Sequence, residues 1–304
     1  MSKGLLDPKV DFVFKNIFGS PNHPEILISF LNATLKAKKK IVNVDIKKTD
    51  IEKQYIEDKY SRLDVKATTS NDEIINIEIQ LKNENNMVKR SLYYLSKMYE
   101  EQLNEKEDYS KLVRTVCINI LNFKYLKTDN FHTGYRFKEI ESNEELTDIM
   151  EVHFIEIPKL QDSSDEKDML VAWTEFLKDP ESEKVRGLEL SIEEIRQAKD
   201  ELIRMSNDST QRELYDMRAN SLRDKMSELN AAERKGIEKG REEGREEGRK
   251  EGRKEGIEEG RKEGIEEGRK EEKIKIARNM KLSGLDTNTI AKITNLSEDE
   301  IDKL

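Results

Sequence analysis

The sequence predicts a mixed α/β (α+β) domain followed by a mostly helical C-terminal region. Two stretches of alternating apolar and polar residues between positions 63 and 82 are typical of paired strands, and apolar residues recur at helical spacing on both sides of them. After Pro180 the chain contains no proline, and most of residues 189–280 favours helix. Because the chain is 39% charged and only 35% hydrophobic, we expect part of it to be extended or solvent-exposed.

Two helices are expected within residues 7–37. Gly19 is a candidate C-cap for the first helix, and Pro21 and Pro24 mark the turn to the second. The apolar residues at helical spacing are Phe12, Phe14, Ile17 and Phe18, then Ile26, Leu27, Phe30, Leu31 and Leu35.

A hairpin is the clearest structural feature of the sequence. Apolar and polar residues alternate over residues 62–68 and again over residues 75–82. Turn-forming residues separate the two runs at positions 70–73. The pattern predicts two antiparallel strands joined by a short turn.

Further elements follow the hairpin. The sequence predicts a helix from about Asn86 to Asn104 and an amphipathic helix over 166–178. It also predicts strands at 113–123, 134–140 and 151–157. Cys117, the single cysteine, lies in the first of these strands, where we expect a buried thiol that forms no disulfide.

The hairpin carries the residues that point to chemistry. Side chains of a strand alternate between its faces, so Glu78, Gln80 and Lys82 share one face, and Asp64 and Lys66 share a face of the partner strand. If the apolar face is buried, Asp64 and Glu78 meet on the polar face. Two neighbouring carboxylates favour a cation between them or a raised pKa, and oxygen ligands suit Mg²⁺ or Mn²⁺. An ordinary hairpin with a solvated polar face is the alternative.

Several motifs in order resemble those of one known family. They are Leu6-Asp7-Pro8, residues 11–19 (DFVFKNIFG), Leu63-Asp64-Val65, residues 76–80 (NIEIQ) and residues 89–95 (KRSLYYL). The sequence resembles the Rpn family of recombination-promoting nucleases, also described as PD-(D/E)XK nuclease family transposases, over about residues 5–180. The resemblance implies a restriction-endonuclease-like PD-(D/E)XK core, divalent-metal chemistry and DNA as the substrate.

The resemblance also implies roles for individual residues. Asp64 and Glu78 correspond to metal ligands, and Gln80 stands where the wider superfamily usually has a catalytic lysine. Glutamine can orient a water molecule by hydrogen bonds but brings no positive charge to the phosphate. We therefore expect slow cleavage, with Lys82 as the first candidate to restore the charge and Lys66 as the second.

Two helices offer additional candidate residues. Asp11 and Lys15 lie one turn apart and form either a surface ion pair or, with Asp11 turned to the metal, part of the site. Arg90 and Lys97 share a helix face with Tyr94. There an arginine or lysine could hold a DNA phosphate, although a solvated face with tyrosine packing is the more ordinary explanation.

Other classes of chemistry find no support in the sequence. The three histidines, His23, His132 and His153, show no ligand spacing, which argues against zinc. No glycine-rich phosphate loop precedes a Lys-Ser/Thr pair, so no nucleotide cofactor is expected. Neither a signal peptide nor a membrane-spanning run is apparent, and we expect a cytoplasmic protein. The net charge of −9 argues against an indiscriminate DNA coat protein.

The C-terminal region is organised around regularly spaced glycines. Nine of the 14 glycines occur at every fourth position from Gly236 to Gly268, with charged residues between most of them. We interpret this run as a marginally stable helical tether, because each glycine costs a helix about 1 kcal/mol. Residues 274–304 then predict three short helices that resemble a helix-turn-helix. The last of these is acidic, whereas a DNA-reading helix should be basic or neutral, so self-association or docking is the preferred role.

Four regions result from this reading. They are a nuclease domain at 1–180, a helical region at 181–235, a charged Gly-repeat tether at 236–272 and a helical tail at 273–304. The leading hypothesis is a metal-dependent DNA endonuclease whose cuts promote recombination or mobile-element activity, with oligomerisation through residues 189–304. The alternative is a weakly active or inactive nuclease fold that binds DNA or protein partners.

Overall fold

The computed structural model describes residues 4–36, 39–47, 64–165 and 167–304. The chain divides into two compact units, residues 1–226 and residues 227–304. The helices are α1 (Asp11–Phe18), α2 (Pro24–Leu35), α3 (Met87–Glu100), α4 (Met169–Lys178), α5 (Glu183–Glu189), α6 (Glu193–Asn207), α7 (Ser209–Leu282), α8 (Thr287–Thr294) and α9 (Glu298–Asp302). The strands are β1 (Val44–Lys47), β2 (Val65–Thr69), β3 (Ile74–Gln80), β4 (Thr115–Leu121), β5 (His132–Lys138) and β6 (Glu145–Glu156).

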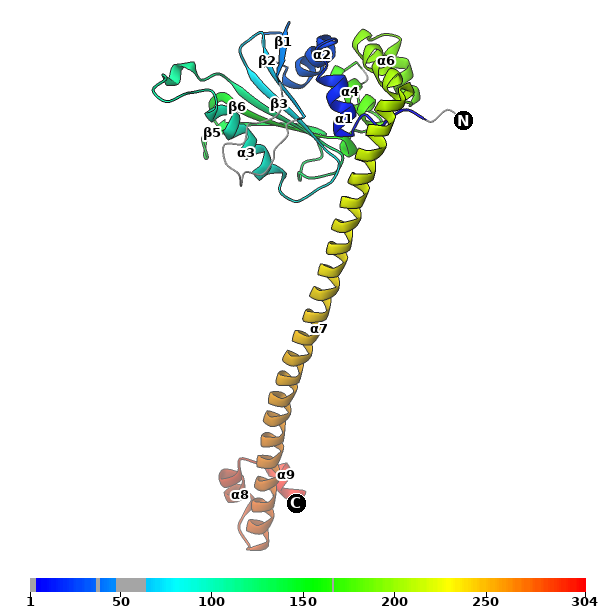
Figure 1. The fold of residues 1–304 in the computed structure, drawn as a ribbon. Coiled ribbons are helices and arrows are strands. Elements are labelled where there is room, and N and C mark those ends of the chain that lie inside the picture. The colour runs from blue at the N-terminus through cyan, green and yellow to red at the C-terminus, as the bar shows by residue number, and fades with distance from the viewer. Residues whose placement is uncertain (1–3, 37–38, 48–63, 166) are drawn as a thin grey trace. The chain divides into compact units, whose positions relative to one another are not determined.

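A six-stranded mixed sheet forms the centre of the first unit (Figure 1). Its strand order is β1-β2-β3-β4-β6-β5. β1, β2 and β3 are antiparallel neighbours, whereas β4 runs parallel to both β3 and β6. The hairpin expected from the alternating pattern is confirmed as β2 and β3, with Val65 opposite Ile77. Every residue of β4 is buried, and the strand is largely apolar, as central parallel strands are, with Thr115 and Asn119 as its polar residues.

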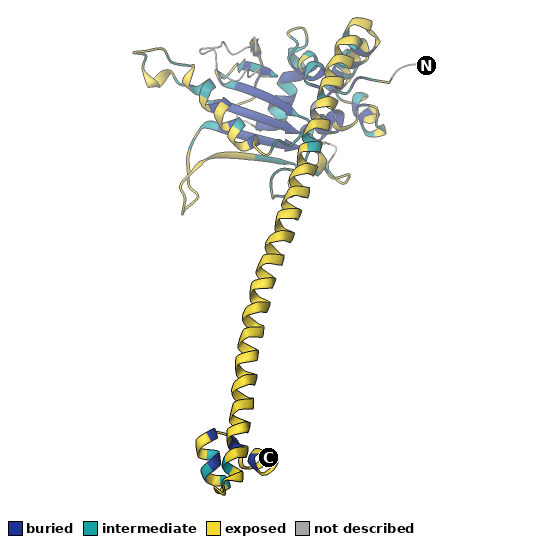
Figure 2. Cartoon of the chain, turned by 60° about the horizontal axis from the view of Figure 1, so that its bottom comes forward, coloured by how far each residue is buried: buried dark blue, intermediate teal, exposed yellow. Residues whose placement is uncertain are grey.

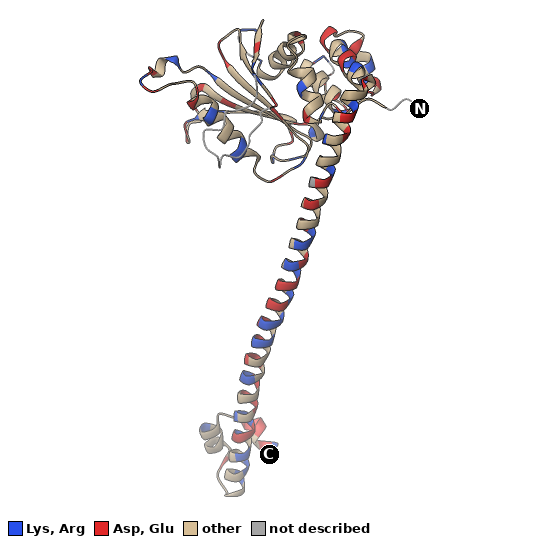
Figure 3. Ribbon diagram, in the orientation of Figure 1, with Lys and Arg blue, Asp and Glu red and all other residues tan. Residues whose placement is uncertain are grey.

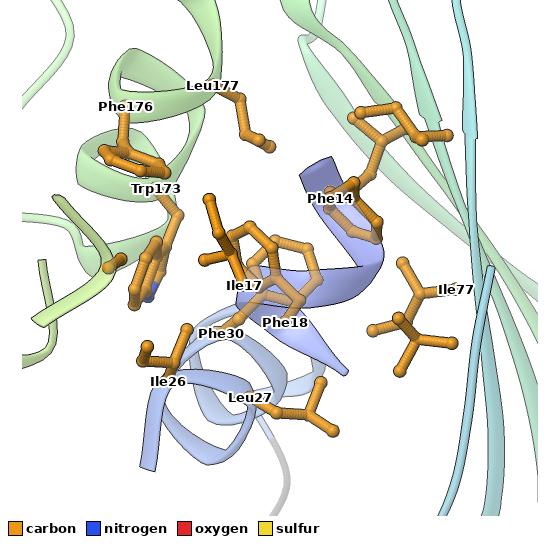
Figure 4. Packing of buried hydrophobic residues seen from close by; sticks show 14 of the residues in the cluster. Phe14, Ile17, Phe18, Ile26, Leu27, Phe30, Ile77, Trp173, Phe176 and Leu177 are labelled. Carbon is orange, nitrogen blue, oxygen red and sulfur yellow. The ribbon is translucent and has the colours of Figure 1, made fainter. Parts of the chain in front are cut away.

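One face of the sheet packs against the main hydrophobic core (Figure 4). Helices α1, α2, α4, α5 and α6 supply most of this core, and Ile75, Ile77 and Ile79 of β3 face it. Phe18 lies at the centre of this core. The centroid of its ring is 4.6 Å from that of Phe14 and 5.3 Å from that of Trp173. Burying a large apolar side chain contributes roughly 1.5–3 kcal/mol, so this face carries most of the stability of the unit.

Helix α3 covers the opposite face of the sheet. Met87 and Leu95 of α3 pack against Cys117, Val152 and Phe154 of β4 and β6. The expected buried thiol of Cys117 is therefore confirmed. The polar side chains of β3 lie on this face as well, so α3 covers the part of the hairpin that the sequence had left open to solvent.

Helix ends follow the local chemistry of the sequence. Pro24 begins α2, where its missing N–H leaves no bond unmade, and Gly19 is the C-cap of α1. The Asp168 side chain caps α4 by accepting from Leu170 N at 2.8 Å. Helix α5, which the sequence analysis did not separate from its neighbours, begins at a Ser182 cap that accepts from Val185 N.

Helix α6 and the beginning of α7 belong to the first unit. Ile195, Ala198 and Leu202 of α6 are fully buried in the main core. Ser206 Oγ accepts from Leu6 N at 3.0 Å, and Arg212 of α7 donates to Gly4 O at 2.9 Å. These bonds connect the first described residues of the chain to a segment two hundred positions later.

The second unit contains the glycine repeat and a small helical module. Residues 236–268 lie within the continuous helix α7 and are exposed (Figure 2). Basic Lys and Arg residues and acidic Glu residues are interspersed along this part of the helix (Figure 3), where ion pairs such as Lys262–Glu258, at 3.0 Å, lie one turn apart. A Cβ atom added at any of the nine repeat glycines would meet no neighbouring atom within 4 Å.

The C-terminal module closes around a four-residue core. Ala277, Ile290, Leu296 and Ile301 are buried together. The predicted capping box is confirmed, because Ser297 Oγ accepts from Glu300 N while the Glu300 carboxylate accepts from Ser297 N. In the described part of the chain, no helix has the length and apolar character needed to cross a bilayer.

Candidate active site

Asp64 and Glu78 face each other across the β2–β3 hairpin. Asp64 directly precedes β2, and extending the strand register by one position places it opposite Glu78. The Asp64 carboxylate accepts a hydrogen bond from Ile79 N, with Oδ2 at 2.7 Å. This bond fixes the side chain against β3, beside the second carboxylate.

Glu78 lies under α3 and is only 1% exposed. Its Oε2 atom accepts from Arg90 Nη2 at 3.1 Å and from Gln80 Nε2 at 3.5 Å. Its Oε1 atom accepts a long hydrogen bond from Asn76 Nδ2 at 3.5 Å. Three side chains from one strand and one helix thus orient a carboxylate that solvent hardly reaches.

Burial raises the pKa of both carboxyls. Burial raises the pKa of Asp64 to about 8, and the neighbouring Glu78 charge adds to this effect. Burial likewise raises the pKa of Glu78, although the Arg90 guanidinium opposes the shift. Without a further cation the pair therefore retains a proton near neutral pH, whereas a bound divalent ion would favour both ionised forms.

A pocket of about 560 Å³ opens beside Asp64. Asp11 and Lys15 of α1 line it, together with Arg204 of α6 and Arg218 of α7. Asp11 forms an ion pair with Arg218, with Oδ2 and Nη1 2.9 Å apart. The spacing of Asp11 and Lys15 had left open a surface pair between these two residues. The structure instead pairs Asp11 with α7 and turns it to the same pocket as Asp64.

The candidate cations lie in different surroundings. Lys66 forms an ion pair with Glu101 at 3.4 Å, and Lys82 Nζ donates to Met226 O at 3.2 Å. Lys97 is half-buried on α3. Arg90, for which the sequence left open a phosphate contact or a solvated face with tyrosine packing, points inward to Glu78. Its guanidinium lies 5.4 Å from the centroid of the Tyr94 ring. The face shared by Arg90 and Tyr94 is consequently turned to the sheet.

Glu78 is surrounded by buried amide side chains, and the sequence alone did not assign these amides to the site. Asn76 is 0% exposed, and its Oδ1 atom has no hydrogen-bond partner among the described residues. Asn119 of β4 accepts from Ser91 Oγ at 2.8 Å and donates to His153 O at 3.1 Å. The alternation of β3 did place Asn76 on the face of Glu78, but nothing in the sequence indicated that β4 and α3 would enclose it.

A second polar network, centred on Glu151, joins β4, β5 and β6. His153 Nε2 lies 2.7 Å from Glu151 Oε1, and His153 Nδ1 lies 2.9 Å from His132 Nε2. Arg114 and Arg136 both donate to Glu151. The two histidines, which are far apart in the sequence, are thus neighbours, and both ring nitrogens of His153 and Nε2 of His132 take part in this network.

The donor set of Asp64 and Glu78 fits a hard divalent cation that keeps water ligands. Among the described residues, no group of three or more His, Cys, Asp or Glu side chains has metal-binding spacing. The two carboxylates would therefore supply part of a coordination shell, with water and phosphate oxygens filling the remainder. An ion held in this way has open positions for a substrate.

Comparison with known proteins assigns both parts of the chain. The family model described as PD-(D/E)XK nuclease family transposase matches residues 8–232. A second model, described as the C-terminal HTH domain of the Rpn/YhgA-like nuclease family, matches residues 270–304. No curated protein and no solved structure matched the chain. With its α/β core, its long C-terminal helix and both matches in order, the chain belongs to the PD-(D/E)XK nuclease family transposases of the Rpn type.

Proposed function

We propose that the protein is a metal-dependent DNA endonuclease. The observation that carries this proposal is the pairing of Asp64 and Glu78 on neighbouring strands beside an open pocket, with the pKa of both carboxyls raised. Mg²⁺ or Mn²⁺ is the proposed cofactor, with Asp64 and Glu78 as ligands and Asp11 as a further ligand from the pocket. Such an ion would activate water and stabilise negative charge on the phosphate.

The residues of the chain have defined tasks in this reaction. Ile79 N holds Asp64, and Arg90 holds Glu78, so both carboxylates are oriented before substrate binds. Gln80, whose amide reaches Glu78, is the proposed residue that orients the attacking water. In hydrolysis the water oxygen attacks phosphorus and one P–O ester bond breaks. The water loses a proton and the leaving oxygen gains one, so each cut yields a phosphate monoester and a hydroxyl.

The pocket beside Asp64 is the proposed route for the DNA backbone. Lys15, Arg204 and Arg218 line it, and phosphate contacts from such side chains position DNA without reading its sequence. Lys66, Lys82 and Lys97 are proposed to contact the backbone further from the carboxylates. Cuts made in this way would promote recombination or mobile-element activity.

A binding module with little cleavage is the second candidate function. It is favoured by Gln80, which brings no positive charge, and by the net charge of −9. Both candidates place DNA at the same pocket and differ in whether the bound strand is cut.

The C-terminal unit, in which residues 270–304 match the HTH domain model, is proposed to mediate self-association. Helix α9 begins with Glu298, Asp299 and Glu300, and these charges would face phosphates if the helix entered a groove. The sequence predicts oligomerisation through residues 189–304. We now propose only residues 227–304 for this role, because α6 already buries its apolar face in the first unit. A truncation ending at residue 232 should sediment as a smaller species than the full chain. An unchanged oligomeric state would refute this role.

The function itself is tested by plasmid cleavage with Mg²⁺, Mn²⁺ or EDTA. Metal-dependent cutting by the wild type and its loss in Asp64→Ala would support the endonuclease. Gln80→Lys should cut faster than the wild type if the missing charge limits the rate. Absence of cutting with every metal, by a folded wild type that still binds DNA, would favour the binding module.

A further inference from the structure

Arg90 brings a positive charge to the site from a helix instead of from the hairpin. It lies on α3, which crosses the polar face of the sheet, and its Nη2 atom is 3.1 Å from Glu78 Oε2. The Tyr94 ring, one turn further along α3, contacts the guanidinium. Since Tyr94 is buried, this contact limits the rotamers that Arg90 can adopt.

The guanidinium keeps donor capacity beyond its bond to Glu78. An arginine side chain has five N–H donors, and Nη2 is the atom that bonds to Glu78. The Nε atom is buried and has no hydrogen-bond partner among the described residues. A buried donor without a partner is costly, and an anion that entered beside Glu78 would satisfy it.

The other basic residues of the hairpin are directed to different partners. Lys66 of β2 forms an ion pair with Glu101, and Lys82 donates to the backbone carbonyl of Met226. Neither of these contacts is to Asp64 or Glu78. Arg90, in contrast, contacts one of the two carboxylates directly, although it is separated from them in sequence by the turn into α3.

We propose that Arg90 donates a hydrogen bond to a non-bridging oxygen of the scissile phosphate and thereby supplies the charge that Gln80 lacks. This inference rests on the endonuclease function proposed above. In the free protein Arg90 compensates the buried Glu78 charge. With a cation bound beside Glu78, that compensation would no longer depend on Arg90 alone, and the guanidinium would be able to donate to the phosphate as well. Bidentate recognition of phosphate is a geometry that arginine favours.

A structural role confined to holding Glu78 would give different mutant behaviour. In that case Arg90→Gln would slow cleavage because Glu78 is no longer held in its orientation. A positive charge introduced at position 80 would then not restore the rate. If the role is phosphate binding, the charge can enter from either side of the phosphate. The double variant Arg90→Gln/Gln80→Lys therefore separates the two roles.

The experiment compares wild type, Arg90→Gln, Arg90→Lys, the double variant and Lys89→Gln. Lys89 is the neighbouring exposed residue of α3 and serves as the matched control. Two quantities are measured for each protein: the single-turnover cleavage rate with Mg²⁺ and the Kd for a DNA duplex with Ca²⁺ in place of Mg²⁺. Circular dichroism establishes that each variant is folded.

Arg90→Gln is expected to lower the cleavage rate about 10²–10³-fold, as removal of a donor to transition-state charge does. It should also raise the Kd by roughly five- to tenfold, since one charged phosphate contact is lost. The double variant Arg90→Gln/Gln80→Lys should cleave at least about tenfold faster than Arg90→Gln. The cleavage rate of Arg90→Lys should fall less than that of Arg90→Gln.

Three results would overturn the inference. They are an Arg90→Gln rate within about threefold of wild type, no recovery in the double variant, and a Kd change no larger than that of Lys89→Gln. If Arg90→Gln does not fold, Arg90→Lys decides, because a full loss of cleavage in that folded variant contradicts a charge-based role. If the wild type itself does not cut, the endonuclease function fails, while the Kd comparison still tests Arg90 as a phosphate ligand.

Discussion

The two faces of strand β3 are equally buried but chemically opposite. Ile75 and Ile77 on one face are each 1% exposed, and Asn76 and Glu78 on the other are 0% and 1% exposed. The first face packs against aromatic and aliphatic side chains from the helices of the main core. The second lies beneath α3 among amides, a thiol and an arginine. Burial alone therefore does not indicate whether a residue contributes to stability.

The difference lies in what each face gains from leaving water. Apolar side chains gain free energy on burial, whereas a buried carboxylate loses hydration and compensates by raising its pKa or recruiting a cation. Asn76 Oδ1 and Arg90 Nε also lack partners among the described residues. The polar face is thus less stable than it would be if it were apolar, which is typical of a surface kept for binding.

The largest effect is expected from removing a carboxylate of the polar face. Asp64→Ala should abolish cleavage and leave the fold intact, because it relieves repulsion with Glu78 in the metal-free protein. Plasmid cleavage and circular dichroism measure the two parts of this prediction. Asp45→Asn, at an exposed position of the edge strand β1, is the control and should cut normally. An unfolded Asp64→Ala protein would mean that the polar face also supports the fold.

Truncation on the apolar face should affect stability instead. Ile77→Ala removes buried methyl groups next to Phe14 (Figure 4) and should lower the free energy of unfolding by about 2–5 kcal/mol. Under native conditions the folded fraction should cut at the wild-type rate. Val42→Ala, at a side chain that is 75% exposed, should change the free energy of unfolding by less than about 0.5 kcal/mol. Equal effects at both positions would contradict the packing described here.

The raised pKa of Asp64 makes stability depend on pH and on metal. The folded pKa of about 8 lies above the ordinary value of 3.8, so the folded state holds the proton more tightly than the unfolded state. Stability contributed by this group is therefore present at low pH and is lost as pH rises towards and through 8. Asp64→Asn should be more stable than wild type at pH 8 by about 1–3 kcal/mol, with little difference near pH 4.

Added Mg²⁺ should reverse that ranking by stabilising the wild type and not the variant. Thermal unfolding at pH 4, 6 and 8, with and without Mg²⁺, measures both effects. If no divalent ion changes the Tm of the wild type at pH 8, a cation between the two carboxylates is contradicted.

The histidine network gives a smaller pH effect of opposite direction. Burial and the neighbouring His153 lower the pKa of His132 to about 4 from an ordinary 6.5. The unfolded state then binds the proton more readily, so stability is full above pH 6.5 and falls as pH decreases towards 4. His132→Gln should remove about 1–2 kcal/mol of the loss in unfolding free energy at pH 4. The Tm profile between pH 6.5 and 4 should therefore be flatter in the variant. An unchanged slope in the variant would assign the acid sensitivity to other groups.

The sequence anticipated much of the hairpin because its information is local. Alternation identified β2 and β3, their turn and the shared face of Glu78 and Gln80, and the order of motifs led to the family that the comparisons confirmed. The capping box at Ser297 was readable for the same reason, since both partners lie within four residues. The nearness of Asp64 and Glu78 followed from register, which side-chain alternation strongly constrains.

Contacts between distant segments were not readable in this way. The inward direction of Arg90, the enclosure of Asn76, the pairing of Asp11 with Arg218 and the joining of His132 to His153 all depend on how α3, α7 and β6 pack. The sequence by itself determined which strands form, which of their faces are polar and which carboxylates meet, because these follow from a two-residue period. Only the tertiary structure decided that both faces of β3 would be buried, and that a charge would reach Glu78 from a helix, because burial and ion pairing depend on which elements pack together.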